Sequence, residues 1–192
     1  LSARPGDTVL DICAAPGSKS FTAAQMMENS GKIFAFDLYE HKCRLIADGA
    51  KRLGISIIKT AIRDGANDCG ELPMADRILC DVPCSGLGIL RRKPEIRFKA
   101  EEELSGLPAL QYRILENAAR FLKPGGTLIY STCTTNREEV VERFLSENSW
   151  AAPLQFAGGF DTIETIGNFM ATLLPQKTGS DGFFFASMTK KK

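Results

Sequence analysis

"TVLDICAAPGSKSFTAAQMMEN", residues 8–29, joins an apolar run to an amphipathic segment through a short loop of small residues. Residues 8–13 predict a buried strand and residues 19–29 a helix. The loop between them carries a single glycine and lacks the G-x-G-x-x-G fingerprint, which leaves a dinucleotide-dependent oxidoreductase with little support. Small residues let the backbone approach a ligand, and the first amides of the next helix favour an anionic group. A tight turn without a ligand remains the alternative.

The rest of the chain repeats this alternation of strand and helix. Further strands are predicted over 32–37, 56–60, 77–82 and 127–132, and further helices over 40–54, 107–122 and 137–148. Five such alternations predict right-handed crossovers and a mostly parallel sheet with helices on both faces. Residues 168–176 and 181–188 predict a closing antiparallel hairpin. This α/β arrangement, with seven strands in one domain over 1–192, resembles the Rossmann-like class I S-adenosylmethionine-dependent methyltransferases.

Charge and composition limit the partners of the chain. It has 192 residues, 44% of them hydrophobic, and its 24 Lys and Arg against 23 Asp and Glu give a net charge of +1. Such a balance excludes a protein that grips nucleic acid over its whole surface, so a polyanion must meet a local patch or another domain. We see neither a signal peptide nor an apolar run of the roughly 20 residues that span a bilayer. We therefore expect a cytoplasmic monomer with no membrane partner, and Leu1 in place of methionine suggests a domain of a longer protein.

The chain has six cysteines: Cys13, Cys43, Cys69, Cys80, Cys84 and Cys133. They form no C-x-x-C pair, so we expect no metal site. Without a secretory signal we also expect no disulfide, and hence reduced thiols. Cys84 follows the strand over 77–82, and Cys133 follows the strand over 127–132. These strands are neighbours in the expected sheet, so both thiols should face one crevice, while Cys43, Cys69 and Cys80 should be structural.

Acidic residues follow three successive strands, at the sheet edge where ligands bind in doubly wound folds. Asp37 could accept both hydroxyls of a ribose, Asp64 could accept from an adenine amine, and Asp81 comes just before Cys84. Any one of them alone is more often a helix cap or a solvated charge. Together they predict a pocket that suits a nucleoside-bearing cation such as S-adenosylmethionine.

Two thiols beside such a pocket suggest chemistry on a pyrimidine. Carbon 5 of a cytosine becomes nucleophilic enough to take a methyl group once a thiolate has added to carbon 6. Asp81 could contact N3 and the exocyclic amine of the base, and Lys19 could help to lower the pKa of the attacking thiol. The residues alone do not choose between Cys84 and Cys133 as the nucleophile.

Four stretches, "DICAAPGSKS", "DVPCSGLG", "YSTCT" and "GSDGFFFASM", resemble motifs of the RNA 5-methylcytosine methyltransferases of the RsmB/Nol1/Nop2/Sun group. The resemblance runs from about residue 5 to 188. It implies methylation of cytosine C5 in RNA, small-subunit (16S) ribosomal RNA above all, through a covalent adduct. It makes Cys133 the nucleophile and assigns product release to Cys84, whereas DNA cytosine methyltransferases attack with the proline–cysteine thiol.

The same resemblance implies which residues hold the methyl donor, all of them in the first loop or at the following strand ends: Cys13, Ala14, Ala15, Pro16, Gly17, Ser18, Lys19, Asp37, Asp64 and Asp81. Ser18 stands where the family usually has glycine, and Ser20 stands where it often has threonine. The resemblance also implies an amino-terminal RNA-binding domain, and we expect this chain to start after it. We therefore expect cofactor binding to survive here and RNA affinity to be poor.

A basic cluster follows the Cys84 loop and comprises Arg91, Arg92, Lys93, Arg97 and Lys99. A solvated charged face is the ordinary interpretation, but beside a base pocket we favour contacts with RNA phosphates. Phe98 could stack on a base or pack under the loop. The alternatives to the rRNA enzyme are a transfer RNA methyltransferase, a DNA cytosine methyltransferase, and an idle RNA-binding or ribosome-assembly domain.

Overall fold

A single nine-stranded sheet runs through the part of the chain that the computed structural model describes, which is residues 1–67, 70–99, 104–134, 138–156 and 163–192. Five strands are parallel: β1 (Thr8–Asp11), β2 (Lys32–Asp37), β3 (Ile58–Ile62), β4 (Ala75–Asp81) and β5 (Leu122–Thr132). Their spatial order is β3-β2-β1-β4-β5, so the order reverses between β1 and β4. This reversal creates a crevice at the carboxyl ends of the strands, as in other doubly wound sheets.

The antiparallel part of the sheet continues beyond β5. β9 (Phe183–Lys190) pairs with β5, β8 (Met170–Leu173) pairs with β9, and β7 (Glu164–Ile166) pairs with β8. β6 (Ala151–Pro153) also pairs with β9. The predicted closing hairpin is thereby confirmed, but seven strands were expected and the described residues form nine. The two extra strands are only three residues long, too short to show an alternating pattern in the sequence.

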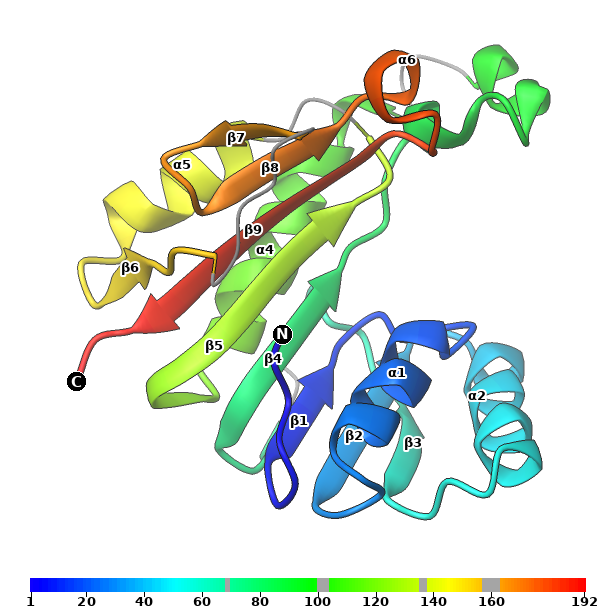
Figure 1. Ribbon diagram of the computed structural model, residues 1–192, viewed down its shortest axis with the longest axis vertical. Coiled ribbons are helices and arrows are strands. Elements are labelled where there is room, and N and C mark those ends of the chain that lie inside the picture. Colours follow the sequence, from blue (N-terminus) through cyan, green and yellow to red (C-terminus); the bar gives the residue numbers. More distant parts are fainter. Residues whose placement is uncertain (68–69, 100–103, 135–137, 157–162) are drawn as a thin grey trace.

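Helices cover both faces of the sheet (Figure 1), as the sequence predicted. α1 (Ser18–Met26) and α2 (Glu40–Arg52) lie on one face, and α4 (Leu107–Ala119) and α5 (Glu138–Glu147) lie on the other. Three short elements complete the described chain: the 3-10 turns η1 (Leu87–Ile89) and η2 (Pro94–Phe98), and α6 (Pro175–Thr178). No helix among the described residues is long and apolar enough to cross a bilayer.

β2 shows why these residues form a central strand. Ile33 and Ala35 pack on the side of α1 and α2, and Phe34 and Phe36 join the larger core on the side of α4. Successive side chains of a strand point to opposite faces, so an all-apolar run fits a strand that is covered on both faces. The central strands owe their stability to this double burial.

Several strand boundaries differ from the predicted ones, and the starts of β3 and β5 show the cause. β3 starts at Ile58 because the chain is still turning at Ile55, whose amide donates to the carbonyl of Ala50 near the end of α2. β5 starts at Leu122, which pairs with Ala75 ahead of the "KPGG" turn, and the register then shifts. The turn interrupts the pairing without ending the strand.

The core next to β9 can be tested with adjacent phenylalanines. Phe184 is fully buried and meets Tyr130 edge-on, with ring centroids 6.2 Å apart. Phe184→Ala should lower the free energy of unfolding by about 3–5 kcal/mol, because a large core side chain leaves a cavity behind. Phe183→Ala is the control, since Phe183 is only half-buried, on the opposite face of the strand, and should cost less. Equal losses in urea unfolding would contradict this packing.

Candidate active site

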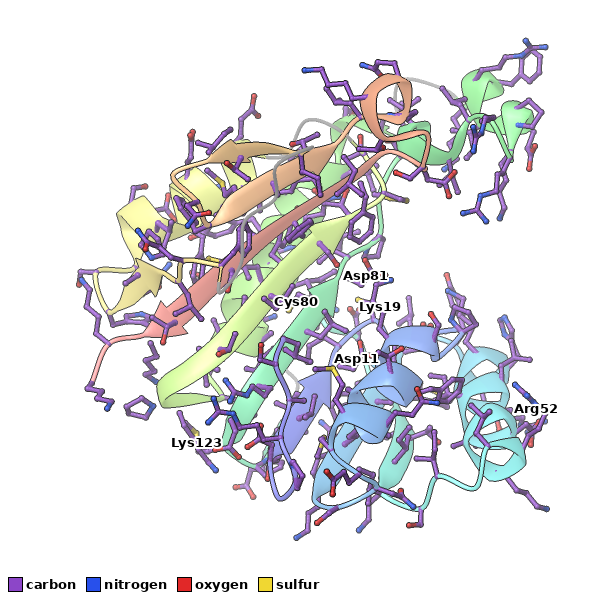
Figure 2. All side chains as sticks on the ribbon, in the orientation of Figure 1. Asp11, Lys19, Arg52, Cys80, Asp81 and Lys123 are labelled. Atoms are coloured by element: carbon purple, nitrogen blue, oxygen red, sulfur yellow. A yellow bond between two sulfur atoms is a disulfide. The ribbon has the colours of Figure 1, made fainter. Side chains whose placement is uncertain are left out.

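The carboxyl ends of β1, β2 and β4 bring three carboxylates to one edge of the sheet. These are Asp11, Asp37 and Asp81, each the last residue of its strand. Figure 2 shows Asp11, Lys19 and Asp81 gathered at this edge, with Lys123 at the opposite end of the strands. The predicted convergence of Asp37 and Asp81 is therefore present, and Asp11 is an addition that the sequence reasoning missed.

A cavity of about 400 Å³ opens at this edge and contains half of the predicted cofactor residues. The predicted residues that line it are Cys13, Ala15, Asp37, Asp64 and Asp81. The remaining predicted residues, Ala14, Pro16, Gly17, Ser18 and Lys19, lie outside its lining. Tyr39, Lys42 and Arg63 also line it and were not predicted, because only the acids near the strand ends were considered.

Hydrogen bonds hold two acids of this cavity, Asp37 and Asp64, in place. Asp37 is only 6% exposed, accepts from the amide of Tyr39 at 3.3 Å, and lies 3.5 Å from the ammonium of Lys42. Asp64 accepts from the amide of Ala66 at 2.9 Å and from the side-chain amide of Asn67 at 2.6 Å. Both carboxylates are thus oriented before any ligand arrives.

The loop over 13–17 places the start of α1 beside these acids. The Ala14 amide donates to the Phe36 carbonyl at 2.8 Å, which ties the loop to the end of β2. Gly17 has a φ of 108°, and a side chain there would collide with the ring of Phe21. The loop therefore requires glycine at this point, and the helix that follows directs Lys19 toward β4.

Lys19, Asp81 and Ser131 form one connected group. The Lys19 ammonium lies 2.6 Å from Oδ2 of Asp81, and the Ser131 hydroxyl donates to Oδ1 at 2.7 Å. Lys19 also lies 5.6 Å from the centroid of the Phe183 ring. Both oxygens of Asp81 therefore accept a hydrogen bond, one from each side.

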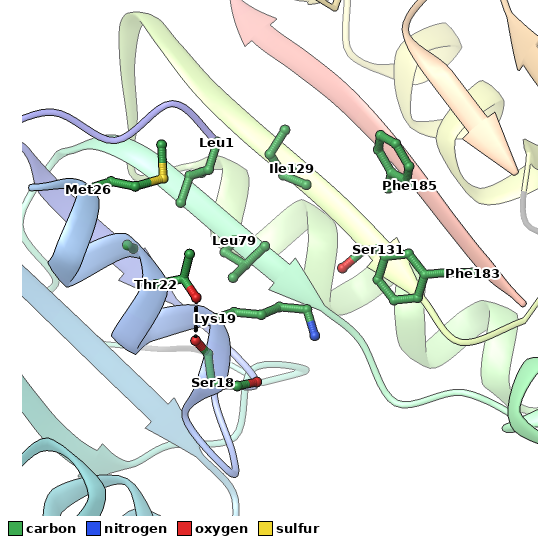
Figure 3. A pocket seen from close by; sticks show the side chains of 11 residues that line it. Leu1, Ser18, Lys19, Thr22, Met26, Leu79, Ile129, Ser131, Phe183 and Phe185 are labelled. Atoms are coloured by element: carbon green, nitrogen blue, oxygen red, sulfur yellow. Dashed lines mark hydrogen bonds between the residues drawn. The ribbon is translucent and has the colours of Figure 1, made fainter. Parts of the chain in front are cut away.

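A second, more apolar cavity of about 360 Å³ lies against this group (Figure 3). Lys19, Ser131 and Phe183 line it, together with Leu79 and Ile129 from β4 and β5. Asp81 lines the acid-rich cavity, so the Lys19–Asp81 ion pair lies where the two cavities meet. A planar apolar group with polar edges could rest in the second cavity and reach both side chains.

The two cysteines that follow β4 and β5 lie together, as predicted, but they are not free thiols. Cys84 and Cys133 form a disulfide, with their Cα atoms 6.3 Å apart. The two cysteines are therefore neighbours, as expected, and the expectation of reduced thiols is wrong for this pair. The expectation considered only the absence of a secretory signal, whereas the two Cα atoms also lie within the range that a disulfide can bridge.

The remaining cysteines agree with structural roles. Cys43 and Cys80 are buried, and Cys69 lies outside the described residues. Burial, with Asp11 and Asp37 nearby, raises the pKa of the Cys13 thiol far above its ordinary value. Cys13 therefore stays a neutral thiol, which is not a nucleophile.

Gly88 joins the Cys84 loop to two other segments. Its amide donates to the Cys133 carbonyl at 2.9 Å, and its carbonyl accepts from the Gly182 amide at 2.7 Å. A side chain at this position would run into the backbone of both partners. The three segments approach so closely only because residue 88 has no Cβ.

Two of the predicted RNA-binding arginines have partners within the chain. Arg92 forms an ion pair with Asp181, and Arg91 donates to the Gly179 carbonyl at 3.2 Å. Both contacts fasten the basic segment to the turn before β9. Arg97 instead lies over the ring of Phe98, at 4.7 Å from its centroid.

Asp11 lies beneath the loop over 13–17, fully buried at the end of β1. Its Oδ2 accepts from the Ser20 hydroxyl at 2.6 Å, and its Oδ1 is buried with no hydrogen-bond partner among the described groups. Burial raises the pKa of this carboxyl to about 7. The only signal in the sequence was an acid that closes an otherwise apolar run.

The fold and the site define a class. The sheet order, the antiparallel end and the acid-lined cavity are those of the Rossmann-like methyltransferases. A solved structure titled "Crystal Structure of PH0851" matches with a TM-score of 0.90 and 33% identity, covering 98% of this chain and 44% of that one. NSun6 from Pyrococcus horikoshii with SFG matches with a TM-score of 0.85 and 28% identity, covering 97% of this chain and 48% of that one.

The chain belongs to the 16S rRNA methyltransferase RsmB/F family, whose family model matches residues 1–189. A curated relative, the probable ribosomal RNA small subunit methyltransferase B of Bacillus subtilis, is 40% identical over the whole chain. The match covers 45% of that relative, so the chain spans about half the length of the curated proteins it resembles.

Asp11 should make stability depend on pH. Its carboxyl is protonated in the folded protein and ionised in the unfolded chain between the ordinary pKa of 3.8 and about 7, so the unfolded state binds fewer protons. The Asp11 contribution is therefore present at low pH and lost as pH rises, by up to about 4 kcal/mol. Asp11→Asn should remove this loss in urea unfolding from pH 4.5 to 8. Asp48→Asn, at an exposed site on α2, should not, and equal slopes for Asp11→Asn and wild type would contradict the assignment.

Reduction should expose two thiols, because only the disulfide protects Cys84 and Cys133 from alkylation in denaturant. Intact-mass measurement after iodoacetamide treatment, on protein purified without a reductant, should show two more alkylated sites after reduction. Cys133→Ser should abolish this increment, and Cys43→Ser should leave it unchanged. Full alkylation of both residues without reductant would contradict the pairing.

Proposed function

We propose that residues 1–192 form the catalytic domain of an S-adenosylmethionine-dependent methyltransferase that modifies carbon 5 of cytosine in small-subunit ribosomal RNA. The observation that carries this proposal is the meeting of Cys84 and Cys133 at the edge where Lys19 and Asp81 form an ion pair. One thiol can attack a base and the other can help to release it. Membership of the RsmB/F family and the name of the Bacillus subtilis relative favour ribosomal RNA over transfer RNA.

The acid-lined cavity suits the methyl donor. Asp37 lies at the end of β2 and can accept from ribose hydroxyls, and Asp64 can accept from the adenine amine. Leu38, Pro83 and Ile114 provide apolar surface for the purine ring. Carboxylates without a phosphate-binding glycine fingerprint favour a cationic ligand over a dinucleotide. When bound, S-adenosylmethionine supplies an electrophilic methyl group.

Cys133 begins the proposed reaction. Its thiolate donates an electron pair to form a bond with carbon 6 of the cytosine, and the electrons of the C5–C6 double bond move to carbon 5 and delocalise toward N3. Carbon 5 then becomes nucleophilic and takes the methyl group. This splits one difficult substitution into easier steps, as covalent catalysis does generally.

Lys19 and Asp81 bind the edge of the base in this proposal. The Asp81 carboxylate accepts from the exocyclic amine, and the Lys19 ammonium donates to ring N3, where negative charge develops after addition. Ser131 keeps the carboxylate oriented through its 2.7 Å hydrogen bond. A cytosine presents one acceptor and one donor on this edge, so the ion pair matches it in hydrogen-bonding pattern.

Cys84 completes the reaction as the base that releases the product. Its thiolate removes the proton from carbon 5, the electrons of that C–H bond restore the C5–C6 double bond, and the bond from carbon 6 to the Cys133 sulfur breaks. Cys133 leaves as a thiolate. The disulfide must first be opened by a thiol reductant that supplies two electrons and two protons, because neither sulfur is nucleophilic while the two are joined.

Single cysteine variants test the two roles. In reduced protein, Cys133→Ala should abolish transfer of labelled methyl to small-subunit RNA, because no adduct can form. Cys84→Ala should instead accumulate a protein–RNA adduct that survives denaturing electrophoresis, because release is blocked. An adduct in Cys133→Ala but not in Cys84→Ala would show that the roles are reversed.

Cofactor binding is the control for this experiment. Both variants should bind S-adenosylmethionine in calorimetry like wild type, because neither sulfur lines the acid-rich cavity. Wild-type protein that binds RNA but gives no heat with S-adenosylmethionine would favour an idle RNA-binding domain instead.

A further inference from the structure

Phe98 is the most exposed large apolar side chain in the described part of the chain. Its exposed fraction is 76%, on a small protrusion formed by η1, η2 and the residues between them. The green helical turns beside α6 in Figure 1 belong to this protrusion. Leaving an aromatic ring in water forfeits the gain from burying it, so this exposure calls for a cause.

Phe98 does not pack under the loop that follows Cys84, because Ile96, another residue of η2, occupies that position. Ile96 is only 8% exposed, and its side chain sits so close to Gly86 that a Cβ there would clash with it. η2 therefore buries Ile96 against the loop and turns Phe98 outward. The sequence left both interpretations of Phe98 open, and the structure excludes the packed one.

The protrusion is fastened to the catalytic loop. The Lys99 ammonium donates to the carbonyl of Ser85, the residue after Cys84, at 3.0 Å. Ile96 reaches Gly86, one residue further along. Phe98 therefore has a fixed position relative to the candidate catalytic cysteine.

Positive charge surrounds the exposed ring. Residues 91–99 hold five cationic side chains and one acid, in a chain whose net charge is only +1. Asp181 neutralises Arg92, and the Arg97 guanidinium lies 4.7 Å over the face of Phe98. An aromatic ring with a stacked guanidinium and nearby cations is complementary to a base with its phosphate.

We propose that Phe98 and Arg97 form a stacking platform for an unpaired RNA base that flanks the target cytosine. The base stacks on the ring, and Lys93 and Arg97 contact neighbouring phosphates. This inference rests on the proposed function, since it takes RNA as the substrate. A protein partner on the same surface would need apolar area around Phe98, whereas its neighbours in sequence, Arg97 and Lys99, are cationic.

Phe98 variants test the platform with a fluorescein-labelled single-stranded RNA of about a dozen nucleotides centred on cytosine. Phe98→Ala should weaken binding roughly 5- to 100-fold, the usual loss of one base–aromatic stack. Phe98→Trp should keep the affinity, and Phe98→Leu should not, because it keeps apolar bulk without an aromatic face. Phe98→Ala should leave the salt dependence unchanged, while Arg97→Gln should reduce its slope by about 1.

Leu45→Ala is the control for loss of an exposed apolar side chain, because Leu45 is 55% exposed on α2 and should not affect RNA binding. Two binding results would overturn the platform. One is an RNA affinity of Phe98→Ala equal to that of wild type, and the other is full RNA affinity in Phe98→Leu, because apolar bulk without an aromatic face would then be sufficient. Wild-type protein that gives no heat with S-adenosylmethionine and does not methylate ribosomal RNA overturns the proposed function as well. Methylation by wild type with an unchanged KM for RNA in Phe98→Ala overturns the platform alone.

Discussion

The in-register parallel pairing of β4 with β5 is the constraint on which the site depends. It sets Asp81 opposite Ser131, and the two cysteines then follow their strands at the same edge. A shift by one residue would turn each side chain to the other face of the sheet. Burial on both faces fixes this register, because Leu79 and Cys80, like Ile129 and Tyr130, alternate between the two sides. The chemistry at the edge is thus a consequence of packing in the middle of the sheet.

Acidic side chains are concentrated at this edge, and their negative charge is reduced in three ways. Asp81 is paired with Lys19, and Asp37 is close to Lys42. Asp11 has no cation in contact and is kept partly neutral by burial, which raises its pKa to about 7. Burial and the neighbouring Asp81 and Asp37 disfavour the charged form of Asp11, so the edge holds less negative charge than its sequence suggests. The remaining negative charge still favours a cationic ligand, and the neutral form of Asp11 lowers the electrostatic repulsion that would destabilise the fold.

The order of elements could be predicted from the sequence because each strand is an apolar run and each helix has apolar residues at helical spacing. The acids Asp37, Asp64 and Asp81 were also predictable, since the carboxyl ends of parallel strands are known to bind ligands. Asp11 was not, because a charge inside an apolar run gives no sign of whether it is buried or exposed. The partners of Arg91 and Arg92 lie more than 80 residues away, in a turn before β9, and no local pattern connects such distant positions. The proximity of Cys84 and Cys133 was predicted from the order of the strands, but their disulfide was missed because the sequence does not state the oxidation state of two neighbouring thiols.

The contacts of Gly88 and Arg92 have a consequence for biosynthesis. Asp181 is translated 89 residues after Arg92, and Gly182 follows it directly. A nascent chain therefore exposes Cys84 well before the segment that braces its loop has left the ribosome. All five parallel strands also precede this segment in the sequence, so the loop after β4 can be braced only once the start of β9 has been synthesised.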